Sequence, residues 1–215
     1  MRVTAVCLFL LATLGLPGLI VAQTDVSRVE RPVWPPVGST WTTRITSTGA
    51  LGSGSQDVTF RALGELDWEG RRVMGIANSL GIHLYYDASR RIVAQVRDGK
   101  PVQTYDPYEA LYEWPLFVGK SWVSNFQIRE YARDQTTSLR YDFRVEVIEE
   151  ATTPAGVFKT FRIRRDSPDD RYVVWFDLEL GIEVKRDWER FASHRLGSGT
   201  NKLELLSHDV KPGAR

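Results

Sequence analysis

The stretch Leu139-Arg140-Tyr141-Asp142-Phe143-Arg144-Val145-Glu146-Val147 decides the fold class, because apolar and charged residues alternate along it without a break. Successive side chains of a β-strand point to opposite faces of its sheet. The odd-numbered residues therefore share one face and the even-numbered residues the other. We expect a central strand here, with Tyr141, Phe143 and Val145 lining a core or a groove while Arg140, Asp142 and Arg144 face water.

The same alternation recurs from Trp41 to the end of the chain, whereas long helical periodicity is almost absent. Trp122, Ser124, Phe126 and Ile128 alternate with polar or exposed neighbours in the same way. Further strands are predicted at residues 41–48, 56–64, 71–78, 82–87, 91–97, 157–165, 171–178, 181–187 and 201–209. The chain is therefore predicted to be all-β: an antiparallel curved sheet, half-barrel or flattened barrel of about ten or eleven strands.

One short helix is expected between Asp106 and Glu113. Asp106 can cap it, Pro107 suits the first helical position, and Glu109 sits where a capping box has its acid. In that helix three tyrosines would lie near one face and pack onto the sheet: Tyr105, Tyr108 and Tyr112.

The first 22 residues have the pattern of a secretory signal. A positive start at Met1-Arg2 is followed by a largely apolar stretch from Ala5 to Ile20 and by the small residue Ala22 before the chain turns polar. We expect cleavage after Ala22 and a periplasmic or secreted protein with no transmembrane segment in the mature chain. The remaining residues are divided into an N-terminal linker (23–33), a single β domain (34–210) and a C-terminal tail (211–215).

Charge and motif content argue against several functions. The 28 basic and 27 acidic residues include Arg2 and no acid in the signal, so the mature chain is balanced, which does not suit a nucleic-acid partner. The single cysteine, Cys7, lies in the signal, and no histidine or cysteine motif predicts a metal or any other cofactor. The run Ser207-His208-Asp209 has the residue types of a hydrolase triad, but neighbours on a strand cannot converge, so no catalytic residue is predicted.

A charged region lies between the strands at 157–165 and 171–178. Arg162, Arg164 and Arg165 are followed by the acidic segment Asp166-Ser167-Pro168-Asp169-Asp170. We expect a solvated hairpin turn whose acids neutralise the basic strand beside it.

The chain contains an internal similarity. Trp34-Pro35-Pro36-Val37-Gly38-Ser39-Thr40-Trp41 reappears, one residue longer, as Trp114-Pro115-Leu116-Phe117-Val118-Gly119-Lys120-Ser121-Trp122. Downstream matches keep their order: Phe60-Arg61 with Phe143-Arg144, Gly70 with Gly156, and Tyr86-Asp87 with Phe176-Asp177. This predicts two pseudo-repeats, 34–113 and 114–210, with Trp41 and Trp122 in equivalent places. A coincidence between two β-rich stretches is the alternative.

The second box, the segment 147–163 that follows it, and the motifs Val174-Trp175-Phe176 and Gly181-Ile182-Glu183-Val184-Lys185 resemble a family of exported bacterial β-proteins catalogued as a domain of unknown function. The sheets of that family are similar to the open half-barrels of lipoprotein carriers. The matching residues are turn and core positions, so the resemblance implies a fold and carries over no catalytic residues.

Aromatic residues are the remaining candidates for a site. A curved sheet that does not close leaves a hydrophobic concavity, and ordinary core packing is the competing interpretation. We therefore expect a non-catalytic envelope or secreted module that binds an apolar small molecule, a lipid or an envelope protein. A structural or assembly protein and an unrecognised hydrolase are the alternatives. The candidate ligand-binding residues are Trp41, Trp122, Phe126, Tyr141, Phe143 and Trp175.

Overall fold

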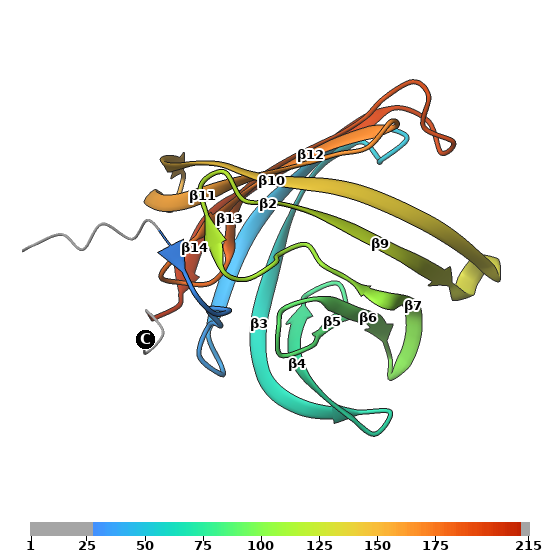
Figure 1. Ribbon diagram of the computed structural model, residues 1–215. Coiled ribbons are helices and arrows are strands. Elements are labelled where there is room, and N and C mark those ends of the chain that lie inside the picture. The colour runs from blue at the N-terminus through green and yellow to red at the C-terminus, as the bar shows by residue number, and fades with distance from the viewer. Residues whose placement is uncertain (1–27, 212–215) are drawn as a thin grey trace, which may run out of the picture.

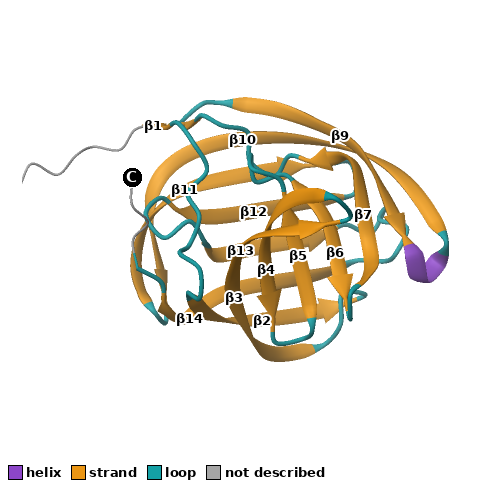
Figure 2. Cartoon of the chain, turned by 90° about the horizontal axis from the view of Figure 1, so that it is seen from below, coloured by secondary structure: helices purple, strands orange, loops and turns teal. Residues whose placement is uncertain are grey.

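Twelve antiparallel strands close into a barrel in the computed structural model, which describes residues 28–211 (Figure 1, Figure 2). The order around the barrel is β10-β11-β12-β13-β14-β2-β3-β4-β5-β6-β7-β9, and β1 pairs with β8 outside it. The predicted export signal, residues 1–22, lies outside the described residues. The strands are β1 (Arg28–Val29), β2 (Thr40–Gly49), β3 (Gly54–Trp68), β4 (Arg71–Asn78), β5 (Ile82–Tyr86), β6 (Ile92–Arg97), β7 (Lys100–Glu109), β8 (Leu116–Phe117), β9 (Ser121–Glu130), β10 (Gln135–Thr153), β11 (Gly156–Asp166), β12 (Asp170–Asp177), β13 (Glu183–Arg190) and β14 (Gly199–Asp209).

The all-β antiparallel prediction is confirmed, but the open half-barrel of about ten or eleven strands is replaced by a closed barrel of twelve. Closure depends on β7, a strand that the sequence did not predict. Strand β9 pairs with β10 along its whole length on one side. On its other side β9 pairs with β7, from Gln103↔Glu130 to Asp106↔Gln127, and this pairing closes the barrel.

The helix expected between Asp106 and Glu113 is wrong. Residues up to Glu109 continue β7, because this segment pairs with a strand on each side: Asp106 with Gln127 of β9, and Glu109 with Ile92 of β6. The next residues form a loop whose side chains are buried, Tyr112 among them. Within residues 28–211 the helical structure is one 3₁₀ turn, η1 (Tyr131–Arg133), and no helix is long and apolar enough to cross a bilayer.

Strand β10 faces as its alternation predicts over most of its length. Phe143 and Val145 are buried and Tyr141 is half-buried, whereas Arg140, Asp142 and Arg144 are exposed. Val147 departs from the prediction because a register shift between Val145 and Val147 moves it to the outer face, opposite Arg162. A bulge of this kind inserts one residue and inverts the alternation beyond it.

Three apolar clusters fill the barrel and its folded-over side. The first is centred on Phe143, Phe161 and Phe176, and the second on Trp41, Ile182 and Leu205. The third cluster contains Val73 and Tyr85 and lies where β3 to β7 curl into a ring (Figure 1). The apolar interior is therefore occupied by side chains over most of its length.

Candidate functional site: a polar cavity in the barrel

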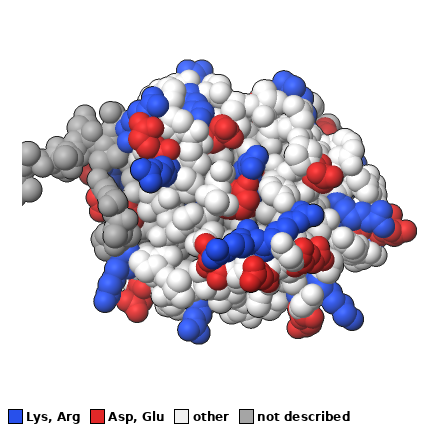
Figure 3. Space-filling view, turned by 60° about the horizontal axis from the view of Figure 1, so that its bottom comes forward, with Lys and Arg blue, Asp and Glu red and all other residues white. Residues whose placement is uncertain are grey.

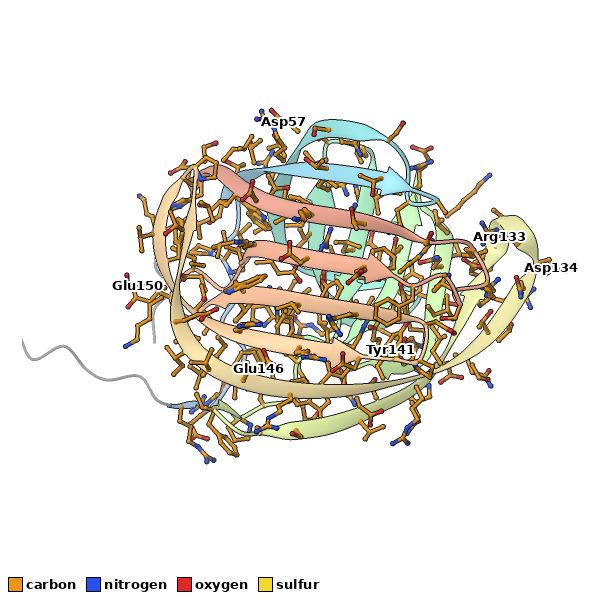
Figure 4. All side chains as sticks on the ribbon, turned by 90° about the horizontal axis from the view of Figure 1, so that it is seen from above. Asp57, Arg133, Asp134, Tyr141, Glu146 and Glu150 are labelled. Carbon is orange, nitrogen blue, oxygen red and sulfur yellow. The ribbon has the colours of Figure 1, made fainter. Side chains whose placement is uncertain are left out.

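A cavity of about 270 Å³ lies among the ends of the strands on the β7, β9, β10 and β11–β13 side of the barrel. Its lining combines aromatic rings with charged and amide groups: Gln95, Gln103, Tyr105, Glu109, Ile128, Glu130, Thr137, Leu139, Tyr141, Arg165, Asp170, Trp188, Arg190, His194, Arg195 and Leu196. Figure 4 shows Tyr141 at the end of the barrel nearest the β9–β10 hairpin, which carries Arg133 and Asp134. A larger hollow of about 560 Å³ near Asp106 and Arg140 has no buried ionisable side chain in its lining.

Asp170 is held at the bottom of this cavity and is only 3% exposed. Arg165 Nη2 donates to Asp170 Oδ2 at 2.7 Å, and Trp188 Nε1 donates to the same oxygen at 2.9 Å. Ser167 Oγ donates to the other oxygen, Oδ1, at 2.7 Å. The expectation of a solvated turn is therefore wrong for Asp170. It lies two residues before the inward-facing Tyr172, which puts it in the inward phase of β12.

Arg165 faces the interior of the barrel, unlike Arg162 and Arg164, the two arginines that precede it on β11. Arg162 and Arg164 stay on the outer face, where both form ion pairs with Glu146. Arg165 follows Phe161 and Ile163 in the inward phase of β11 and is buried. Its guanidinium lies 3.9 Å from the ring centre of Tyr141 and 4.7 Å from that of Tyr172, contacts that favour a cation.

Glu109, the last residue of β7, completes the buried charges and is 7% exposed. Its carboxylate lies 3.9 Å from Arg165 Nη1, and no described residue donates a hydrogen bond to it. Burial raises the pKa of Glu109 to about 7, Asp170 raises it as well, and Arg165 opposes both. Burial also raises the pKa of Tyr105 and brings that of Tyr141 to about 12, so both phenols are neutral.

The cavity collects polar atoms that the protein leaves without partners. Among the described side chains, seven buried nitrogen or oxygen atoms lack a hydrogen bond, and three of these belong to the cavity lining: Thr137 Oγ1, Arg165 Nε and Arg190 Nε. Arg190 lies over the ring of Trp188 at 4.7 Å, and burial lowers its pKa. Buried polar groups are normally satisfied, so this concentration in one cavity indicates room for a polar ligand.

The six aromatic candidates do not line one common groove. Four of them form a continuous row on the inner face of β9 and β10, in the order Trp122, Phe143, Tyr141 and Phe126. Of these four, Tyr141 lines the cavity. Trp41 lies in the second apolar cluster. Trp175 lies on the outer face, where its Nε1 donates to Glu149 Oε1 at 2.7 Å. Their roles in ligand binding stay predictions.

Among residues 28–211 no group of three or more histidine, cysteine, aspartate or glutamate side chains is arranged to hold a metal ion. The charged residues that line the cavity were missed by the sequence reasoning. The strand alternation could have indicated two of them, because Arg165 and Asp170 occupy inward positions of strands whose other inward residues are apolar.

Comparisons with known proteins give distant structural likenesses. No family model matches the chain, and no curated protein does. The hypothetical lipoprotein YmcC from Escherichia coli is similar at 13% identity and a TM-score of 0.43, over 83% of this chain and 86% of that one. An exported protein with a YmcC-like fold from Bacteroides fragilis matches at 11% identity and 0.42, over 84% and 99%. A candidate lipoprotein from Parabacteroides distasonis matches at 12% identity and 0.40, over 84% and 99%. The functional argument therefore rests on the geometry of the cavity.

Proposed function

We propose that the protein is a non-catalytic binding module of the cell envelope whose cavity holds a small polar molecule. The predicted export signal supports the envelope location. The observation that carries the binding role is the cavity itself, whose lining residues include the buried acid Glu109 and three residues that each have an unpartnered buried polar atom. Leaving such groups unpaired costs free energy, and a ligand with matching groups recovers it.

The proposal keeps the binding role expected from the sequence and changes the class of ligand. The apolar interior is filled by packed rings and aliphatic side chains, whereas the remaining space is bordered by charged and amide groups. A volume of about 270 Å³ lies just below the usual range of ligand pockets, roughly 300 to 1,000 Å³. The cavity therefore suits a compact polar molecule better than a long acyl chain.

The proposal is tested by filling the cavity. Thr137 lines it, whereas Thr136, the preceding residue on β10, is exposed and points to the other face. We expect mass spectrometry of extracts from natively purified protein to find small polar molecules with the wild type and with Thr136→Trp. The same molecules should be absent from Thr137→Trp. Equal recovery from both variants, or no polar molecule from the wild type, would exclude the cavity as the binding site.

A further inference from the structure

We infer that the ligand is a small zwitterion, with an ammonium group placed at Glu109 and a carboxylate placed at Arg190. This inference rests on the proposed binding function and names the chemical class of the ligand. It follows from the way in which charges of opposite sign succeed one another across the cavity.

Four charged side chains form an alternating row. Arg190 and Asp170 are direct cross-strand partners on β13 and β12, so their side chains share a face. Asp170 is bonded to Arg165 at 2.7 Å, and Arg165 lies 3.9 Å from Glu109. The two inner members compensate each other closely. The two outer members, Arg190 and Glu109, are left with unsatisfied charge or hydrogen-bonding capacity at opposite ends of the row.

The Glu109 end suits a cation. The charged groups that act on the pKa of Glu109 are Arg165 on β11, which lowers it, and Asp170 on β12, which raises it. Glu109 in turn raises the pKa of three tyrosines around it: Tyr86 on β5, Tyr105 on its own strand β7 and Tyr141 on β10. Arg165 is the single cation among them and is already bonded to Asp170. An ammonium group would donate the hydrogen bonds that Glu109 lacks, and aromatic rings in the lining favour a cation.

The Arg190 end suits a carboxylate. Arg190 forms no ion pair with a residue in the described range 28–211, and its Nε has no hydrogen-bond partner. Its neighbour at the rim of the cavity is another cation, Arg195. A planar guanidinium with free donors recognises a carboxylate through two parallel hydrogen bonds.

Ligands with one charge satisfy only one end. A simple carboxylate pairs with Arg190 but requires Glu109 to be protonated, because two negative groups would otherwise share a small cavity. A simple amine pairs with Glu109 and leaves Arg190 unpaired. A zwitterion serves both ends and adds no net charge to the cavity.

Calorimetry with probes of graded length tests the inference on the full mature chain. The zwitterions are glycine, β-alanine, 4-aminobutyrate and 5-aminopentanoate, and the singly charged controls are pentanoate and pentylamine. We expect one zwitterion to bind at least tenfold more tightly than either control. Its affinity should fall about tenfold from pH 8 to pH 6, as a carboxyl group with a pKa near 7 gains its proton.

Two variants sharpen the test. Glu109→Gln keeps the shape of the side chain and removes its charge. At pH 8 the zwitterion should therefore lose about tenfold in affinity, whereas pentanoate should bind more tightly than it does to the wild type, because the negative charge that repels it is gone. Glu150→Gln, at an exposed position of β10 outside the cavity lining, is the matched control and should change neither affinity. If pentanoate binds as tightly as any zwitterion and binds more tightly as the pH falls, the inference is overturned and the cavity remains a binding site for anions. If no zwitterion binds, the inference is also overturned, while co-purification from Thr137→Trp and Thr136→Trp still decides the proposed function independently.

Discussion

The two Trp-Pro boxes lead into strand pairs with the same local geometry, yet only the second half of the chain contributes the buried ion pair of the cavity. Trp41 is the second residue of β2 and stacks on its cross-strand partner Phe60 at 5.6 Å with an interplanar angle of 11°. Trp122 is the second residue of β9 and stacks on its partner Phe143 at 5.1 Å and 4°. The two indoles therefore occupy matching places.

The loops before these strands also match bond for bond. Gly38 donates to Ala62 at 2.9 Å and Ala62 donates back to Ser39 at 2.9 Å. In the second half, Gly119 donates to Val145 and Val145 donates to Lys120, again at 2.9 Å each. A register shift follows at once in both partner strands, after Ala62 in β3 and after Val145 in β10. These equivalences support the proposed duplication.

The aspartate turns of the two halves meet inside the molecule. Asp87 Oδ1 accepts from the backbone of Ser89, and Asp177 Oδ1 accepts from that of Glu179, both at 2.9 Å. From the first turn the buried guanidinium of Arg90 reaches the second and donates to the carbonyl of Gly181 at 2.8 Å. The two turns are thus joined by a hydrogen bond from the side chain of Arg90 to the backbone of Gly181.

The difference between the halves lies in one hairpin. Strands β11 and β12 have 11 and 8 residues, whereas β4 and β5 have 8 and 5, so each strand of the second hairpin is three residues longer. Counted from the matched glycines 70 and 156, the added length carries Arg165 and Asp170. The shorter hairpin ends instead at Asn78, whose side chain closes its own turn. The shared geometry builds the barrel, and an extension of the second copy supplies the buried pair of Arg165 and Asp170.

Truncating the two stacked phenylalanines should give the largest effect. Phe143 is 2% exposed and lies in the first apolar cluster, so Phe143→Ala should lower the free energy of unfolding by about 3 to 5 kcal/mol. Phe60 is half-buried, and Phe60→Ala should cost about half as much. Urea unfolding of both variants measures the difference.

Arg144→Ala is the control for this comparison, because Arg144 is the exposed neighbour of Phe143. It should change stability by less than about 0.5 kcal/mol. If Arg144→Ala is the more damaging change, the assignment of faces on β10 is inverted. If Phe60→Ala costs more than Phe143→Ala, the difference in burial between the two phenylalanines does not determine their contributions to stability.

Replacing Glu109 by Gln should stabilise the protein at high pH. The pKa of Glu109 rises from its usual 4.5 to about 7 in the folded state, so the folded protein holds this proton more firmly than the unfolded chain does. Ionising Glu109 therefore costs stability progressively between pH 4.5 and 7. Above pH 7 the full cost of about 3 kcal/mol applies. Glu109→Gln should recover most of it at pH 8 and nothing at pH 4, as measured by urea unfolding at both values.

Asp170→Asn provides the contrast. The Asp170 carboxylate already accepts hydrogen bonds from three side chains, and it is the ion-pair partner of the buried Arg165. This variant should lose stability at pH 8, since it leaves a buried guanidinium without its counter-charge. A stability gain from Asp170→Asn, or a gain from Glu109→Gln that is the same at pH 4 and pH 8, would contradict the assigned roles.

The barrel was predictable from the sequence because strand alternation is a local signal. Tyr141, Phe143 and Val145 already show which side of β10 is buried. Strand β7 was not predictable, since Pro101 and Pro107 interrupt its pattern and its pairing depends on the distant edge of β9. Closure of the barrel is consequently a non-local property.

The cavity was harder to predict for a related reason. Glu109, Arg165 and Asp170 each lie at the end of a strand, where a charged side chain is usually solvated. They become buried because closure of the barrel brings the end of β7 close to the end of β11, where Glu109 lies 3.9 Å from Arg165. The phase of Arg165 after Phe161 and Ile163 was the one local indication of its inward direction.

The glycines of the two boxes give the smallest expected effect and the most direct test of equivalence. Gly38 and Gly119 have positive φ angles of 85° and 91°, and a Cβ atom at either position would meet nothing within 4 Å. The cost of an alanine is therefore only that of placing a residue with a Cβ atom in the left-handed conformation, about 1 to 2 kcal/mol of stability at each site. We expect Gly38→Ala and Gly119→Ala to lower the free energy of unfolding by equal amounts, within about 0.5 kcal/mol. The exposed neighbours Val37 and Val118 serve as controls, and their alanine variants should have almost no effect. A difference above about 1 kcal/mol between the two glycine variants would mean that the two loops contribute differently to the free energy of unfolding. The match between the halves would then be limited to the conformation of these turns.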